Sequence, residues 1–116
     1  SLKSAILNFD KLESKKSKKY LLLGDMLELG KHSKKLHQFI GKIINRTKID
    51  KVFVKGNKAL FIFSSILKKK KLRILKNNSQ IIDLIKNDLN NNDYLMVKAS
   101  NATGFNKIVN DLKVLK

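Results

Sequence analysis

The chain has 116 residues, enough for one domain, and no cysteine, which excludes a disulfide framework, a thiolate metal site and a cysteine nucleophile. No apolar run approaches the roughly 20 residues of a membrane-spanning helix, and no secretory signal is visible, so we expect a cytoplasmic protein. The formal charge is +17, from 26 Lys and Arg against 9 Asp and Glu.

This charge suggests a nucleic-acid partner, but its make-up argues against one. Only Arg46 and Arg73 are arginines, and Arg is the residue that base edges and phosphates favour. The chain contains 24 Lys, 12 Asn and 12 Ile but only 4 Ala, and Lys, Asn and Ile all have AT-rich codons. The lysine clusters at residues 15–19 and 68–71 have no interleaved aromatic residues for base stacking. We therefore interpret the charge as a solvated surface, and keep a basic nucleic-acid-binding α/β module as the alternative, with another anionic partner as a third possibility.

The first half of the chain predicts a helix, a buried strand and a second helix. Residues 2–12 place apolar side chains on one helical face. Residues 20–23 are a continuous apolar run stopped by Gly24, which is typical of a strand buried on both faces of a parallel sheet. Residues 33–46 carry an apolar stripe at helical spacing and predict the second helix.

The second half of the chain continues the strand–helix alternation. Short strands are predicted at residues 51–54, 72–75 and 94–97. The helices that follow them are marked by Asn57 as a cap with Leu60, Phe63 and Leu67, by Ser79 as a cap with Ile82, Ile85 and Leu89, and by Phe105, Ile108, Val109 and Leu112. The alternation predicts a single domain over residues 1–116: a Rossmann-like α/β fold, with a mostly parallel sheet of about four or more strands and helices on both faces.

Ligands of such sheets meet the loops at the carboxyl ends of the strands, so we look for a site there. The loop after the first strand consists of Gly24, Asp25, Met26, Leu27, Glu28, Leu29 and Gly30. Its glycine spacing fits neither a Walker phosphate loop nor a dinucleotide-binding turn. The carboxylates of Asp25 and Glu28 could bind a cation, orient Lys or Arg groups, or cap the next helix.

The loop after the fourth strand brings Lys98, Ser100 and Asn101 to the start of the last predicted helix. A helix N-terminus favours an anion, so a carboxylate or phosphate of a substrate would fit there, although Ser100 could instead cap the helix. His32 and His37 are five residues apart and have no evident third ligand, so no metal site is predicted.

Residues 20–30, followed by Leu36 and His37, resemble the carboxy-terminal domain of the Mur ligase family, in which a strand leads into a Gly-Asp-Met-Leu-Glu-Leu-Gly loop and then a helix with a Leu-His pair. Residues 93–101 resemble the family's Asp-x-Val-Leu-Val-Lys-Gly-Ser-Arg segment, with Ala99 and Asn101 in place of Gly and Arg. The resemblance covers essentially the whole chain. It is greatest for the branch that adds D-alanyl-D-alanine to UDP-N-acetylmuramoyl-tripeptide.

This resemblance implies one domain of a three-domain, ATP-dependent ligase of peptidoglycan precursor synthesis. The missing central and amino-terminal domains would hold most of the ATP, the Mg²⁺ and the UDP part of the substrate, so the isolated chain would be inactive. Lys98, Ser100 and Asn101 would bind the dipeptide, and Asp25 and Glu28 would contact the nucleotide-bearing domain or the attacking amine. No residue of this chain is predicted to be catalytic. A stand-alone α/β nucleotide-binding or receiver-like domain is a weaker alternative, because the single Asp25 and the loop over residues 24–30 fit that class poorly.

Overall fold

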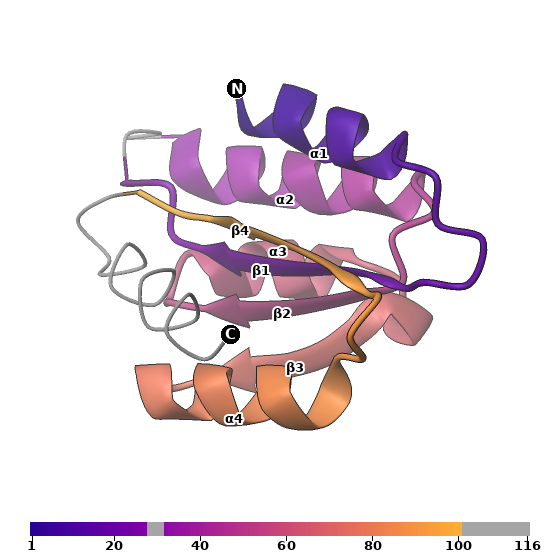
Figure 1. The fold of residues 1–116 in the computed structure, drawn as a ribbon. Helices are drawn as coiled ribbons and strands as arrows, with labels where there is room; N and C mark the ends of the chain where they lie inside the picture. The colour runs from indigo at the N-terminus through magenta and orange to yellow at the C-terminus, as the bar shows by residue number, and fades with distance from the viewer. Residues whose placement is uncertain (28–31, 101–116) are drawn as a thin grey trace.

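A computed structural model describes residues 1–27 and 32–100 (Figure 1). The elements in chain order are α1 (Leu2–Asp10), β1 (Lys19–Gly24), α2 (Ser33–Asn45), β2 (Lys51–Lys55), α3 (Ala59–Ser65), the 3₁₀ helix η2 (Lys68–Lys70), β3 (Lys71–Leu75), α4 (Asn78–Asp88) and β4 (Tyr94–Lys98). The helix predicted around residues 105–112 lies outside the described residues. No helix in the described part of the chain is both long and apolar enough to cross a bilayer.

Within the described residues all the strands are parallel, and they form a four-stranded sheet of order β3-β2-β1-β4. The chain therefore moves outward from β1 to β3 and then returns to place β4 on the other side of β1. This reversal makes a topological switch point between the carboxyl ends of β1 and β4, where open α/β sheets bind their ligands. The predicted fold class is confirmed, and the strand order, which the sequence left open, gives the location of a site.

Helices cover both faces of the sheet (Figure 1). On one face α1, α2 and α3 pack through residues that include Ile6, Phe9, Leu21, Leu23, Ile40, Ile44, Val52, Val54 and Ile62. On the other face α4 packs through Tyr20, Leu22, Phe53, Leu75, Ile81 and Leu84. Every residue of β1 is buried, because this central strand has a packed layer on each side. Each fully buried Leu or Ile contributes roughly 1.5–3 kcal/mol through removal of its apolar surface from water.

Helices α2 and α3 cross closely because Gly41 leaves room at their contact. A Cβ atom on Gly41 would lie 2.7 Å from Cβ of Ser65 and 2.9 Å from the carbonyl oxygen of Ile62. A larger residue would push the helices apart, which sets the position of α3 and of the turn before it.

The predicted helix caps are wrong in two places. Asn57 does not cap α3, which begins at Ala59. The cap of α4 is Asn77 rather than Ser79, because Oδ1 of Asn77 accepts the N–H of Gln80 at 3.0 Å. Both helices also end earlier than predicted. Leu67 and Leu89 therefore lie beyond α3 and α4.

Two of the clustered lysines are buried, which corrects their interpretation as a solvated surface. Lys19 and Lys70 are only 2% and 5% exposed. The ammonium of Lys70 donates to the carbonyl oxygens of Thr47 at 2.9 Å and Ile49 at 2.6 Å. The ammonium of Lys19 donates to the carbonyl of Asp10. Burial, followed by the nearby charge of Lys69, lowers the pKa of Lys70.

Candidate functional site

The two loops singled out in the sequence meet at the switch point. The backbone N–H of Ser100, after β4, donates to the carbonyl oxygen of Asp25, after β1, at 3.0 Å. The N–H of Leu27 donates in return to Oγ of Ser100 at 2.7 Å. These reciprocal bonds fix the two loops relative to each other although they lie 73 residues apart in sequence.

The carboxylate of Asp25 holds a third loop, the turn between β2 and α3. Its Oδ1 accepts the N–H of Ala59 at 2.8 Å, which satisfies an amide at the first turn of α3. The carboxylate also lies against Gly56. Glycine is required at this position for two reasons: its φ is +122°, and a Cβ there would overlap Asp25. Asp25 therefore caps α3, whereas the sequence suggested a cap for the next helix in the chain.

His37 of α2 supports the loop that follows β1. It is fully buried on α2, and its Nε2 accepts the N–H of Met26 at 3.2 Å. Its Nδ1 lies 2.6 Å from the carbonyl oxygen of Ser33, a group that can only accept. This network assigns the neutral tautomer with the proton on Nδ1, because Nε2 must stay unprotonated to accept from Met26. The prediction considered His37 only as a metal ligand and missed this role. The available signal was Ser33, one helical turn earlier on the same face.

Lys98 lies at the same edge, as the last residue of β4, and its side chain is exposed. It pairs in register with Leu23 of β1, so it lies on the face of the sheet that α1, α2 and α3 cover. Among the predicted site residues, the structure brings together Asp25, Met26, Leu27 and Ser100, with Lys98 two residues before Ser100. Glu28, Leu29, Gly30 and Asn101 lie outside the described residues.

The described residues offer no group of three or more His, Cys, Asp or Glu side chains that could hold a metal ion. The residues at the switch point can bind and orient an anionic ligand through Lys98, and they hold three loops in place through backbone amides.

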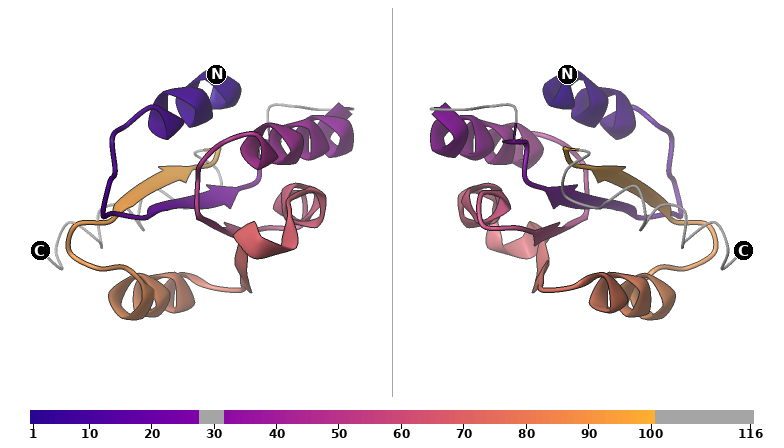
Figure 2. Two further views of the ribbon diagram at one scale, coloured as in Figure 1. Left: turned by 90° about the vertical axis from the view of Figure 1, so that its right-hand side faces the viewer. Right: turned by 90° about the vertical axis from the view of Figure 1, so that its left-hand side faces the viewer.

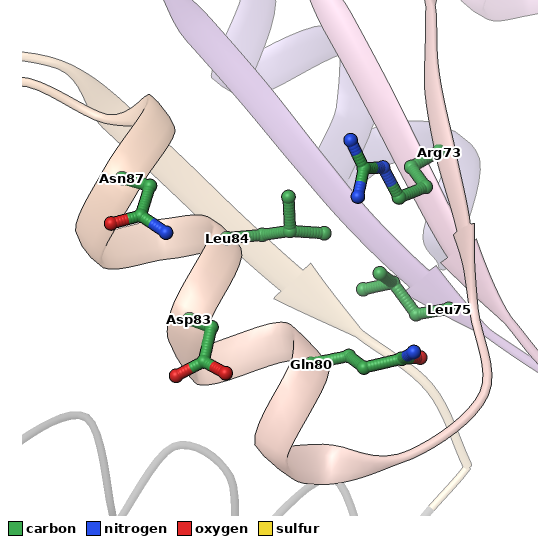
Figure 3. A pocket seen from close by; sticks show the side chains of 6 residues that line it. All are labelled: Arg73, Leu75, Gln80, Asp83, Leu84 and Asn87. Carbon is green, nitrogen blue, oxygen red and sulfur yellow. The ribbon is translucent and has the colours of Figure 1, made fainter.

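A separate pocket of about 150 Å³ lies between β3 and α4 (Figure 3). Its lining consists of Arg73, Leu75, Gln80, Asp83, Leu84 and Asn87. It is smaller than the roughly 300 Å³ at which ligand pockets usually begin. Its Gln80 is already engaged, because Oε1 accepts the N–H of Lys76 at 2.8 Å. We therefore place the candidate site at the switch point and not in this pocket.

Comparison with known proteins gives one consistent result. The chain is 35% identical over 115 residues to the UDP-N-acetylmuramoyl-tripeptide–D-alanyl-D-alanine ligase of Bacillus subtilis (strain 168), covering 97% of this chain. It is 37% identical over 108 residues to the ligase of the same name from Buchnera aphidicola, covering 87% of the chain. No protein-family model matches the chain.

A solved structure agrees with these relatives. The fold superimposes on the MurF ligase of Thermotoga maritima, crystallised in complex with ADP, with a TM-score of 0.70, 25% identity and 94% of this chain covered. The chain spans only about a quarter of the length of each relative, with 25%, 22% and 23% covered. The predicted resemblance is thus confirmed: the chain is homologous over nearly its whole length to one segment of these ligases.

Proposed function

We propose that this chain, a homologue of one segment of the D-alanyl-D-alanine-adding Mur ligases, is the carboxy-terminal domain of such an enzyme and positions the incoming dipeptide. The activity of the complete enzyme would be the ATP-dependent joining of D-alanyl-D-alanine to UDP-N-acetylmuramoyl-tripeptide in the cytoplasm. The observation that carries the proposal is the meeting of the two family-like loops at the β1/β4 switch point, through Asp25, Leu27 and Ser100.

Lys98 is the residue we assign to the carboxylate of the dipeptide. Its exposed ammonium stands at the carboxyl end of β4, beside the loop that Ser100 holds in place. An ammonium–carboxylate contact of this kind binds the ground state and the transition state alike, so its loss would raise KM more than it lowers kcat. Ser100 and Asn101 would complete this subsite.

Asp25 contributes to the site by positioning. Because its Oδ1 is occupied by the N–H of Ala59, the carboxylate orders the loop that leads to Glu28. Glu28 remains our candidate for contact with the attacking amine or with the nucleotide-bearing domain. Holding reactants in a productive geometry is worth several kcal/mol in such a two-substrate reaction.

ATP and Mg²⁺ would be held mainly by the other domains. When bound there, the nucleotide supplies the phosphoryl group that activates the tripeptide carboxylate. In this chain Lys98 would bind and orient, and closure of the domain would exclude water from the reacting groups.

The proposal is tested with the complete product of the reading frame that encodes this chain. We expect ATP-dependent formation of the UDP-linked pentapeptide from the tripeptide and D-alanyl-D-alanine. We expect none from residues 1–116 alone, and none from the complete product when these residues are deleted. A complete product that folds, binds ATP and forms no pentapeptide would overturn the assignment.

A further inference from the structure

The two lysine clusters of the sequence converge on one edge of the sheet, opposite the candidate site. Parallel strands begin at a common edge, and residues 10–19, 46–51 and 67–71 lie at the starts of β1, β2 and β3. We call these three segments the basic edge. Figure 2 (left) looks onto this side of the molecule.

Hydrogen bonds between the segments make the basic edge a continuous surface. Oδ1 of Asp10 accepts the N–H of Lys48 at 2.8 Å. The ammonium of Lys51 donates to the carbonyl oxygen of Lys69 at 2.7 Å. The buried ammoniums of Lys19 and Lys70 bind further carbonyls of the same segments. Because these bonds fix the loops, their exposed side chains are presented on an ordered surface.

More than half of the net charge of the chain lies on this edge. The three segments contain twelve Lys and Arg against three Asp and Glu, a formal charge of +9 out of the +17 of the whole chain. Asp93 borders the edge, and its carboxylate accepts the N–H groups of Lys18 and Asn90. The exposed cations include Lys11, Lys18, Arg46, Lys48, Lys68 and Lys69.

Exposed leucines lie among these cations. Leu12, just beyond α1, is 47% exposed, and Leu67, just beyond α3, is 45% exposed. The backbone of Leu67 is held by Asn45 of α2, whose Oδ1 accepts its N–H at 2.8 Å. Each leucine is adjacent in sequence to an exposed lysine, Lys11 or Lys68. Lysines that meet lipid phosphates, with apolar side chains that enter the headgroup boundary, are the pattern of a peripheral membrane surface.

A nucleic-acid surface would have a different composition. It would favour Arg over Lys, and aromatic side chains for single strands. Arg46 is the only arginine of the basic edge, and its three segments contain no aromatic residue. We propose that the basic edge is a peripheral binding surface for membranes rich in anionic phospholipid, separate from the switch-point site and independent of the proposed function.

The experiment is co-sedimentation of the chain with vesicles of phosphatidylglycerol mixed equally with phosphatidylcholine, and with vesicles of phosphatidylcholine alone. We expect binding to the anionic vesicles only, weakened at high salt. Changing Lys68→Gln together with Lys69→Gln should weaken binding by at least about tenfold. Leu67→Ser should weaken it further, with little dependence on salt. Circular dichroism checks that each variant is folded, which we expect because all three side chains are exposed.

The matched control is Lys35→Gln together with Lys76→Gln, which removes the same charge from exposed positions at the opposite edge. We expect less than a twofold change from it. The proposal is overturned by absence of binding to the anionic vesicles at low salt, or by equal losses in the two double variants. Tighter binding to duplex RNA than to the vesicles, lost in the Lys68/Lys69 variant, would instead assign the edge to nucleic acid.

Discussion

The loops at the two edges of the sheet are held in place by different kinds of hydrogen bond. At the amino edge, side-chain charges stabilise the loops, because the ammoniums of Lys19 and Lys70 donate to carbonyls and the carboxylates of Asp10 and Asp50 accept backbone N–H groups. At the carboxyl edge, the loops are joined by backbone amides that reach Asp25, Ser100 and His37. The cation Lys98 stays exposed there.

This difference distinguishes buried lysines, which stabilise loops, from exposed lysines, which can meet a partner. A charged group that is buried and fully hydrogen-bonded in the protein is poorly suited to take a ligand, whereas an exposed one beside a rigid loop is suited to it. At the amino edge the buried Lys19 and Lys70 therefore stabilise the fold, whereas Lys98 at the carboxyl edge is exposed and is the residue we propose for the substrate. The following predictions test that division, from the largest expected effect to the smallest.

The largest effect is expected at Lys70. Lys70→Met leaves the carbonyls of Thr47 and Ile49 buried without their donor, so the free energy of unfolding should fall by about 2–4 kcal/mol. The neighbouring Lys69→Met should change it by less than about 0.5 kcal/mol, because that side chain is exposed. Urea unfolding of both variants measures this. Equal stabilities would show that Lys70 is not a structural lysine.

The second effect concerns His37. His37→Leu removes the acceptor of the Met26 N–H and the donor to the Ser33 carbonyl, and should cost about 1–3 kcal/mol. His37→Gln restores an acceptor and should recover part of the loss. Hydrogen exchange of the Met26 amide reports on the bond itself. The assignment fails if that amide is equally protected in the wild type and the Leu variant.

A smaller effect is expected at Asp25. Asp25→Ala removes the acceptor for the N–H of Ala59 and should cost about 1 kcal/mol, as the loss of a helix cap does. Asp25→Asn keeps an oxygen at that place and should cost less. Thermal unfolding of the two variants compares them, and a larger loss in Asn than in Ala would contradict the capping role.

The smallest effect depends on pH. The N–H bonds from Lys18 and then Asn90 lower the pKa of Asp93 below its ordinary value of 3.8. The folded state therefore binds fewer protons there than the unfolded state, and the stabilisation is present above pH 3.8 and lost as the pH falls through the lowered pKa. Urea unfolding at a series of pH values measures this. The difference in the free energy of unfolding between wild type and Asp93→Asn should shrink as the pH falls below 3.8.

The sequence predicted the architecture because its signals were local. The apolar run of residues 20–23 and the apolar stripe of residues 33–46 each lie within one element, and their order alone indicates a parallel α/β sheet. The caps of α3 and α4 were harder to predict from the sequence. Asp25 caps α3 from 34 residues away, so no local pattern around Asn57 could reveal it.

The sequence indicated where a candidate site could lie, but not what its individual residues do in the fold. The sequence singled out the loops after β1 and β4 as candidates, and the structure shows that they are in contact. Their adjacency could not be predicted, because it requires the strand order, which depends on tertiary packing. Lys19 and Lys70 were indistinguishable in sequence from their exposed neighbours, because burial of one lysine in a run depends on which loop packs over it. The sequence showed His37 as part of a Leu-His pair typical of the family, but its hydrogen bond to the loop after β1 became evident only from the tertiary structure.

The most direct test of the functional account is the dependence of dipeptide KM on Lys98 in the complete ligase. With Lys98→Ala we predict that KM for D-alanyl-D-alanine rises at least about tenfold while kcat changes less. Lys76→Ala, a lysine at the same edge but after β3, should leave KM unchanged. An unaltered KM in Lys98→Ala, or an equal rise in both variants, would contradict the assignment of the dipeptide to the β1/β4 switch point.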